Sequence, residues 1–350
     1  MINNAKRGKI SPIQLFFIFL VSRLVITLTY IQAISLGNMS SDLLLSIVLA
    51  FLFTMLLSIP VYLCIIKNKN PFEVKWIAVL YAIYFMYSAV VNISRFSYFA
   101  ASRLNPDSSM IFFIIIISAA VCYAAVMGIE SLGRFGVFCG VVLVIAVFIV
   151  AVFNIDNIDM INFYPFFGNS RTEIFENSAV ITSNSIEPAL LLSLSRRVNG
   201  KQSKPLFFGI IAAFATIFLL IFLCLGVLGS AVSLQSYPIF TLFQMASIGS
   251  FSRLDMFHTA FWIFGLFLKC SVLVYASSIA ITKFTHIKKC LVIAFIIGIG
   301  SIAITNGLGE QTSDYAKIIS VSVFSVFSVI IPVIYLIAGK KKEENLIEKL

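Results

Sequence analysis

The sequence predicts an all-α polytopic membrane protein with ten transmembrane helices. Of its 350 residues, 60% are hydrophobic and only 11% are charged, and the mean hydropathy is +1.03. A soluble domain needs more charged residues than this to cover its surface. Long apolar stretches alternate with short basic ones, and a membrane-spanning helix needs about 20 apolar residues. Both features are typical of a multi-pass membrane protein.

Ten apolar stretches follow one another along the chain, and each is expected to form one span. Their predicted bounds are residues 11–36, 41–66, 74–102, 108–127, 135–153, 178–195, 206–228, 256–281, 290–304 and 315–338. Residues 1–350 then form a single transmembrane domain, with short tails at 1–10 and 339–350.

The positive charges predict how the chain is oriented in the membrane. With this set of spans, 18 of the 25 Lys and Arg residues fall in stretches on one side of the membrane. Four fall on the other side, and Arg23, Arg95 and Lys269 lie within spans. Cytoplasmic loops carry the excess of Lys and Arg, so both termini are expected in the cytoplasm.

The longest connection on the outer side, residues 154–177, separates the fifth span from the sixth. This position suggests two five-helix repeats, about 11–153 and about 178–338. Five crossings leave the chain on the opposite side, so the two repeats would be inverted relative to each other. The argument is topological, since the two halves show no residue-level similarity.

Several other classes of protein are excluded by the sequence. The six cysteines are scattered through apolar segments without a CxxC pair, so neither a disulfide framework nor a metal site is expected. His258 and His286 lie in separate segments, and catalytic motifs are lacking, so we expect neither an enzyme nor a cofactor. The net charge is +10. The lysine and arginine residues that produce it lie mainly in short loops, where they are expected to meet lipid headgroups, and this argues against nucleic-acid binding.

The sixth predicted span contains the least membrane-like heptapeptide of the chain, residues 182–188 (Thr-Ser-Asn-Ser-Ile-Glu-Pro). Pro188 lacks an amide donor and clashes with the carbonyl four residues earlier. Backbone groups freed in this way are tolerated at membrane depth only inside protein or beside a cavity. We therefore expect a discontinuous helix here, with Ser183, Asn184 and Glu187 facing a polar cavity. The alternative is a proline-kinked helix whose polar side chains bond to neighbouring helices.

If the two halves repeat, the first span should be discontinuous as well. Its polar residues include Arg23 and Thr27, but it has neither glycine nor proline. The threonine hydroxyls could instead bond back to their own helix. Arg23 lies well inside the apolar run and must find an acceptor or water.

Lys269, near the centre of the eighth span, is the most unfavourable residue of the chain in a membrane. A central lysine costs about 2.5–3.5 kcal/mol on insertion scales. It should therefore face the interior, near Glu187 or other acceptors, in either a functional or a purely structural pair. Arg95 and Tyr98 in the third span are weaker candidates of the same kind. Glu130 and Arg134 have the spacing of a structural ion pair at a helix end.

The sequence around Lys269 resembles the B subunits of spore germinant receptors, the endospore germination permeases of the amino acid-polyamine-organocation superfamily. The resemblance rests on Tyr237-Pro238, residues 252–255 (Ser-Arg-Leu-Asp), Trp262, Gly265, Lys269, Ser271 and Tyr275. Residues 10–15 and 128–134 are similar to two further segments of the family.

This resemblance implies a ten-helix inverted-repeat bundle in the spore inner membrane, beside an A subunit and a C-subunit lipoprotein. It implies a pocket between the first, third, sixth and eighth helices that binds a nutrient such as an amino acid or a sugar. The expected ligand-binding residues are Arg23, Thr27, Tyr98, Ser183, Asn184 and Glu187, and Lys269 is expected to couple charge. This chain departs from its relatives in the first helix, where they tend to carry a glycine-containing break.

Two other functions stay open at this point. The chain could be a proton-coupled secondary transporter of amino acids or polyamines, with Lys269 or Glu187 as the coupling group. It could also be a passive structural subunit that holds its partners in the membrane and has no pocket.

Overall fold

The computed structural model describes residues 8–29, 40–165, 170–200, 203–235, 237–246, 255–282 and 321–337, together with residues 168, 296, 297 and 300. The side chains of residues 26–29, 203, 255 and 282 lie outside this description. The regular structure of these residues is helical, and an isolated bridge between Ile10 and Val198 is their one β pairing.

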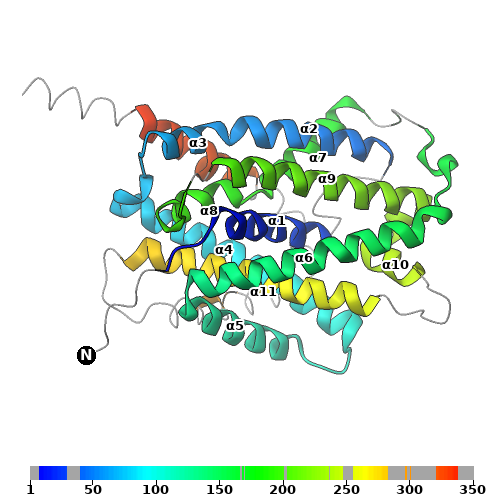
Figure 1. Ribbon diagram of the computed structural model, residues 1–350. Helices are drawn as coiled ribbons and strands as arrows, with labels where there is room; N and C mark the ends of the chain where they lie inside the picture. Colours follow the sequence, from blue (N-terminus) through cyan, green and yellow to red (C-terminus); the bar gives the residue numbers. More distant parts are fainter. Residues whose placement is uncertain are drawn as a thin grey trace, which may run out of the picture.

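The described helices form one bundle (Figure 1). The α-helices are α1 (Pro12–Thr29), α2 (Asp42–Leu57), α3 (Ile59–Ile66), α4 (Lys75–Phe99), α5 (Met110–Met127), α6 (Ile129–Asn154), α7 (Arg171–Ser183), α8 (Glu187–Leu194), α9 (Ser203–Leu228), α10 (Pro238–Met245) and α11 (Asp255–Thr282). A further helix covers Val321–Ile337. The short 3₁₀ or π segments are η2 (Pro71–Glu73), η3 (Ala100–Leu104), η4 (Ile155–Asn157), η5 (Met160–Phe163), η6 (Ser195–Arg197), η7 (Gly229–Leu234) and η9 (Ser325–Ile330).

Six helical stretches of the described chain are long and apolar enough to cross a membrane. They are Asp42–Ile66, Lys75–Leu104, Met110–Met127, Ile129–Asn157, Lys204–Leu234 and Met256–Ile281, and they lie in the second, third, fourth, fifth, seventh and eighth predicted spans. Shorter apolar helices lie in the first and tenth. The ninth predicted span falls mostly outside the described residues. The all-helical class is thus confirmed, whereas the number of ten spans and the two repeats stay predictions.

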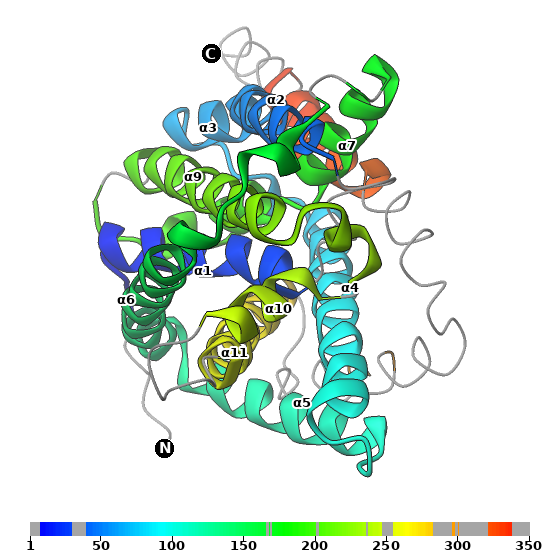
Figure 2. The ribbon, with the colours of Figure 1, turned by 90° about the vertical axis from the view of Figure 1, so that its right-hand side faces the viewer.

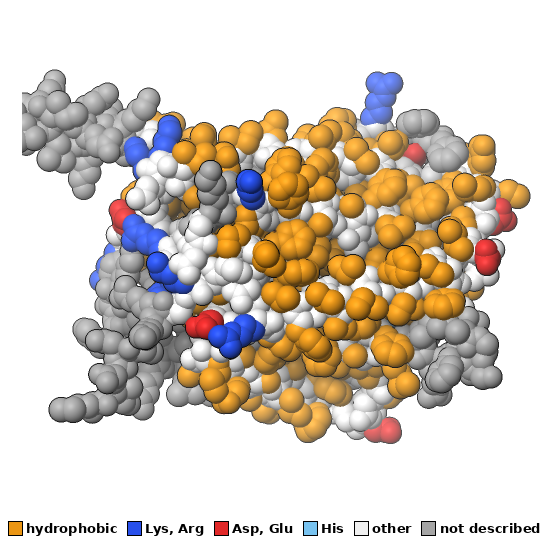
Figure 3. Space-filling view, viewed as in Figure 1, with side chains coloured by type: hydrophobic (Ala, Val, Ile, Leu, Met, Phe, Trp, Pro, Cys, Tyr) orange, Lys and Arg blue, Asp and Glu red, His pale blue; other side chains and the backbone are white. Residues whose placement is uncertain are grey.

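The outer surface has the composition of a membrane protein. Hydrophobic side chains form a broad band along the flank, and most of the visible Lys and Arg side chains gather toward one end of it (Figure 3). Large apolar side chains such as Phe112, Phe148 and Phe208 are more than half exposed. An apolar surface of this extent is favourable in contact with lipid and unfavourable in contact with water.

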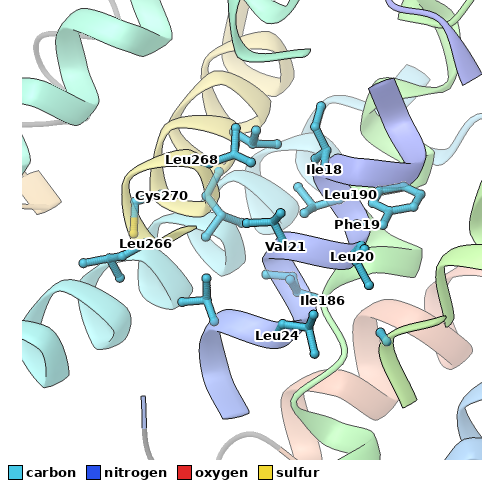
Figure 4. Packing of buried hydrophobic residues seen from close by; sticks show 14 of the residues in the cluster. Ile18, Phe19, Leu20, Val21, Leu24, Ile186, Leu190, Leu266, Leu268 and Cys270 are labelled. Atoms are coloured by element: carbon cyan, nitrogen blue, oxygen red, sulfur yellow. The ribbon is translucent and has the colours of Figure 1, made fainter. Parts of the chain in front are cut away.

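α1 lies in the middle of the bundle, packed against α6, α9 and α11 (Figure 2). Its side chains Ile18, Val21 and Leu24 are fully buried. Figure 4 shows Ile18 and Val21 of α1 among buried side chains of α11, such as Leu268, and of α8, such as Leu190. The most central helix of the bundle is therefore also one of its most tightly enclosed.

The predicted break in the first span is wrong for residues 23–29, because α1 is an unbroken helix from Pro12 to Thr29. Arg23 explains the difference. Its Nη2 donates a 2.6 Å hydrogen bond to the carbonyl of Ile181, and its guanidinium lies 5.1 Å from the ring centroid of Phe214. Since this side chain finds its acceptor on a neighbouring helix, the backbone of α1 does not need to unwind. Residues 30–36 of the predicted span lie outside the described part.

Close packing around α1 depends on glycine at a point where α11 approaches it. A Cβ atom at Gly265 would lie 2.5 Å from Cγ2 of Val25 and 3.4 Å from Cγ1 of Val21. A Gly265→Ala substitution is therefore expected to destabilise the bundle by about 1–3 kcal/mol through overpacking. Thermal unfolding of the purified protein would measure this loss. If the cause is the contact with Val25, a Gly265→Ala/Val25→Ala double variant should lose less stability than the two single variants together.

The start of α7 contains a sequence signal for a helix N-terminus. The hydroxyl of Ser170 accepts a 3.2 Å hydrogen bond from the backbone N–H of Glu173, three residues later. This Ser-x-x-Glu pattern is the one that starts many helices. It explains why the helix begins at Arg171, seven residues before the predicted span.

The ion pair predicted between Glu130 and Arg134 is present at the start of α6. Arg134 Nη2 lies 2.6 Å from Glu130 Oε1, and both side chains are more than half exposed. Such an exposed pair contributes little to stability, which agrees with its interpretation as a local structural feature.

Candidate functional site

The sixth predicted span is discontinuous. α7 ends at Ser183, α8 begins at Glu187, and residues 184–186 between them are not helical. Pro188 lies in the first turn of α8, where its missing N–H leaves no helical hydrogen bond unmade. The expected break is therefore present, and the alternative of a merely kinked helix does not hold.

Side chains of the break satisfy the carbonyls at the end of α7. The hydroxyl of Ser183 and the amide of Asn184 both donate to the carbonyl of Val180, at 2.8 and 3.0 Å. The hydroxyl of Thr182 donates to the carbonyl of Ser178 at 2.8 Å. Hydroxyl and amide groups compete in this way with the backbone ladder. The polar residues of this segment thus stabilise an interruption that an apolar sequence would not.

One side of the break borders a pocket of about 60 Å³, here called the break pocket. Ser183, Asn184 and Ile186 line it from the break. The opposite wall is α4, and one further side chain, Val323, comes from the helix Val321–Ile337. The residues from α4 are Tyr84, Tyr87, Ser88, Val91, Asn92 and Arg95.

The other side of the break borders a smaller buried cavity of about 10 Å³, here called the inner cavity. Arg23 of α1, Thr54 of α2, and Ser185 and Glu187 of the break supply its polar lining, and the rest is apolar. Glu187 is only 4% exposed, and its Oε1 accepts a 3.0 Å hydrogen bond from the hydroxyl of Ser22. The two sides of the break therefore have different chemistry.

Lys269 connects α11 to α1. Its side chain is 1% exposed, and its Nζ donates a 2.8 Å hydrogen bond to the carbonyl of Ser22. The ammonium group also interacts electrostatically with Glu187, Arg23 and Arg95. Ser22 thus contacts both charges, through its carbonyl to Lys269 and through its hydroxyl to Glu187.

Two buried cations near the break share one carboxylate. Arg23 and Lys269 both interact electrostatically with Glu187. Taking charges out of water is expensive unless they are compensated. Arg95 adds a guanidinium to the lining of the break pocket, where it can bind a negative group of a ligand.

A larger opening of about 890 Å³, the α10 vestibule, lies at the end of the molecule where η3, α10 and α11 meet. Arg103, Gln235 and Tyr237 are among the residues that line it. Arg103 lies in η3, which continues the helical stretch of α4, and at a rise of roughly 1.5 Å per residue it is about 12 Å from Arg95 along that stretch. The vestibule and the break pocket therefore occupy different depths along Lys75–Leu104.

An aromatic layer separates these two depths. Phe99 of α4 and Trp262 of α11 are fully buried, with ring centroids 4.1 Å apart. Tyr237, which lines the vestibule, packs on Phe99 at 4.8 Å. Phe96, one turn deeper on α4, lies 5.3 Å from Trp262. Phe96 and Phe99 thus lie between Arg95 of the break pocket and Arg103 of the vestibule along the chain.

A family model described as spore germination protein matches residues 9–313. The chain belongs to the spore permease family. No curated protein matches its sequence significantly. The spore permease is similar in fold to a Na⁺-coupled sialic acid symporter solved in a substrate-bound, outward-open state, with a TM-score of 0.58 and 13% sequence identity. That alignment covers 90% of the spore permease and 78% of the symporter chain, and it shows a shared fold only.

These comparisons confirm the family resemblance and the transporter-like architecture. The matched family is one of spore germination proteins and not of enzymes.

The structure distributes the predicted site residues of the spore permease over several places. Ser183 and Asn184 lie at the break pocket, whereas Arg23 and Glu187 lie at the inner cavity. Tyr98 is half-buried near the end of α4 and is not part of the break pocket lining. The backbone of Thr27 lies in α1, but its side chain is outside the described part.

The polar face of α4 that lines the break pocket was not predicted as a set from the sequence. Tyr84, Ser88, Asn92 and Arg95 are spaced by four, four and three residues. Side chains at such spacings share one face of a helix. A search for polar side chains at helical spacing within the third predicted span would have found this face.

Proposed function

We propose that this spore permease is the membrane subunit of a spore germinant receptor, which binds a small nutrient in the break pocket and thereby triggers germination. The observation that carries the proposal is the polar break between α7 and α8, which faces the polar stripe of α4 across a pocket. Broken helices beside a cavity are the usual form of a solute site at membrane depth.

The charge around the break pocket favours an amino acid over a sugar. Arg95 lines the pocket, and its positive charge also acts on Lys269. The planar guanidinium of Arg95 can bind a carboxylate through two parallel hydrogen bonds. The side chains of Ser183 and Asn184 can bind the remaining polar groups of the ligand.

The signal would come from a shift between two packings of the bundle. A ligand can shift such an equilibrium only by its difference in affinity for the two states. The nutrient would enter through the α10 vestibule and displace the aromatic layer around Phe99 and Trp262. By family resemblance, the receptor works in the spore inner membrane with an A subunit and a C-subunit lipoprotein, and the charge pattern favours cytoplasmic termini.

A secondary transporter is the second candidate. It is favoured by the fold shared with a symporter and by the buried ammonium of Lys269 between α1 and α11. In this alternative, Lys269 or Glu187 exchanges a proton with each transport cycle.

Ligand-dependent thermal stabilisation of the purified chain tests the proposal. Amino acids and sugars are screened one by one, and a true ligand at 100 times its Kd stabilises the folded state by about 2.7 kcal/mol. We expect stabilisation by at least one amino acid, and its loss in an Asn184→Ala variant. Asn105→Ala, an exposed change in the loop after α4, is the matched control and should keep it.

Measurement of ligand uptake distinguishes a receptor from a transporter. Binding without uptake into proteoliposomes supports a receptor, and saturable uptake of the bound amino acid supports a transporter. If none of the amino acids or sugars stabilises the protein, the nutrient-binding role is refuted and a passive structural role remains.

A further inference from the structure

Three buried polar atoms without a hydrogen-bond partner among the described residues belong to side chains that line the inner cavity. They are Nε of Arg23, Oγ1 of Thr54 and Oγ of Ser185. Their side chains are 4%, 1% and 1% exposed. A buried polar group without a partner destabilises a protein by about 1–3 kcal/mol. Three of them around one cavity indicate a shared partner inside it.

Thr54 does not make the usual hydrogen bond of a helical threonine. A threonine within a helix commonly donates to the carbonyl four residues earlier, which here is that of Ala50. The hydroxyl of Thr54 makes neither this bond nor another among the described residues. It is therefore available to an occupant of the cavity.

The size and chemistry of the cavity select its occupant. A volume of about 10 Å³ is close to the minimum that holds one water molecule. The positive charge of the Arg23 guanidinium disfavours a metal cation in the cavity, and the negative charge of the Glu187 carboxylate disfavours an anion. Water suits both groups, since it accepts from Nε–H, which is only a donor, and donates to oxygen.

We propose that one internal water molecule occupies the inner cavity and bridges α1, α2 and the break. It accepts a hydrogen bond from Arg23 Nε–H and bonds to the hydroxyls of Thr54 and Ser185, within the two to four partners that a buried water needs. This water fixes the break from the side away from the break pocket. The inference does not rest on the nutrient-binding function.

A double-mutant cycle in the full chain tests whether Thr54 and Ser185 share this partner. Thr54→Val and Ser185→Ala are each expected to lower the melting temperature. Because both hydroxyls hold the same water, the double variant is expected to lose clearly less than the sum of the two single losses. The control pair is Thr54→Val with Ser118→Ala, a buried unpartnered hydroxyl on α5, and its losses should add. Additive losses in the Thr54/Ser185 pair would overturn the shared water.

A density map of the unaltered protein at a resolution that shows waters gives a second, independent test. We expect one density feature within hydrogen-bonding distance of Arg23 Nε and Ser185 Oγ. A cavity without density overturns the proposal. Anomalous signal after replacement of chloride by bromide also overturns it, because the occupant is then an anion.

Discussion

A Glu187→Gln substitution is expected to destabilise the folded spore permease by about 3–5 kcal/mol, the usual loss when one member of a buried ionic group is removed. Glutamine keeps the size of the side chain and can still accept the hydrogen bond from Ser22. The main change is therefore electrostatic, because the buried cations Arg23 and Lys269 lose the carboxylate that interacts with both. Thermal unfolding of the purified protein measures the loss, and nutrient-triggered germination should fall with it.

A substitution of Lys269 removes a positive charge from the same cluster of buried charges, whereas Glu187→Gln removes a negative one. A Lys269→Met substitution removes the hydrogen bond to the carbonyl of Ser22, but it also lowers the positive excess. We therefore expect a smaller loss of stability than for Glu187→Gln, and partial recovery when the two changes are combined. Lys204→Met, at the exposed start of α9, is the control and should be close to neutral. If Lys269→Met proves more damaging than Glu187→Gln, the charge imbalance is not what governs this site.

Predictions that depend on a single element succeeded from the sequence. Pro188 and the four polar residues before Ile186 conflict with a regular membrane helix, and the helix is interrupted there. The spans around Lys75–Leu104 and Met256–Ile281 follow directly from hydropathy and length. Such features are set by local physical chemistry, namely the lost amide donor of proline and the apolar thickness of a bilayer.

Predictions that depend on which helices meet were less complete. The two-repeat argument suggested a break in α1, yet Arg23 finds its acceptor in the carbonyl of Ile181, more than 150 residues away in the sequence. Ser183 and Glu187 were assigned to one site, but the turn between them directs Ser183 to the break pocket and Glu187 to the inner cavity. The sequence contains no signal for the direction of each side chain in a non-helical segment, because that direction is fixed by the surrounding helices.

An Arg95→Gln substitution is expected to weaken nutrient binding by about 10- to 100-fold, because a hydrogen bond to a charged group contributes about 1.5–3 kcal/mol. Arg95 is half-buried and lines the break pocket together with Ser183 and Asn184. The measurement is ligand affinity by thermal shift or calorimetry on the purified chain. Arg103→Gln, about two helical turns away in the α10 vestibule, is the matched control and should change affinity only slightly. Equal losses in both variants would indicate a general electrostatic effect and not a contact.

The ligand itself can show whether Arg95 contacts a carboxylate. In the unaltered protein, the amide or methyl ester of the bound amino acid should bind much more weakly than the free acid, since a neutral group makes a weaker hydrogen bond to the guanidinium than a carboxylate does. In the Arg95→Gln variant this preference should shrink, because each change removes the same interaction and their effects do not add. An undiminished preference for the free acid would place the carboxylate elsewhere, such as at the first amides of α8, where the positive end of that helix lies.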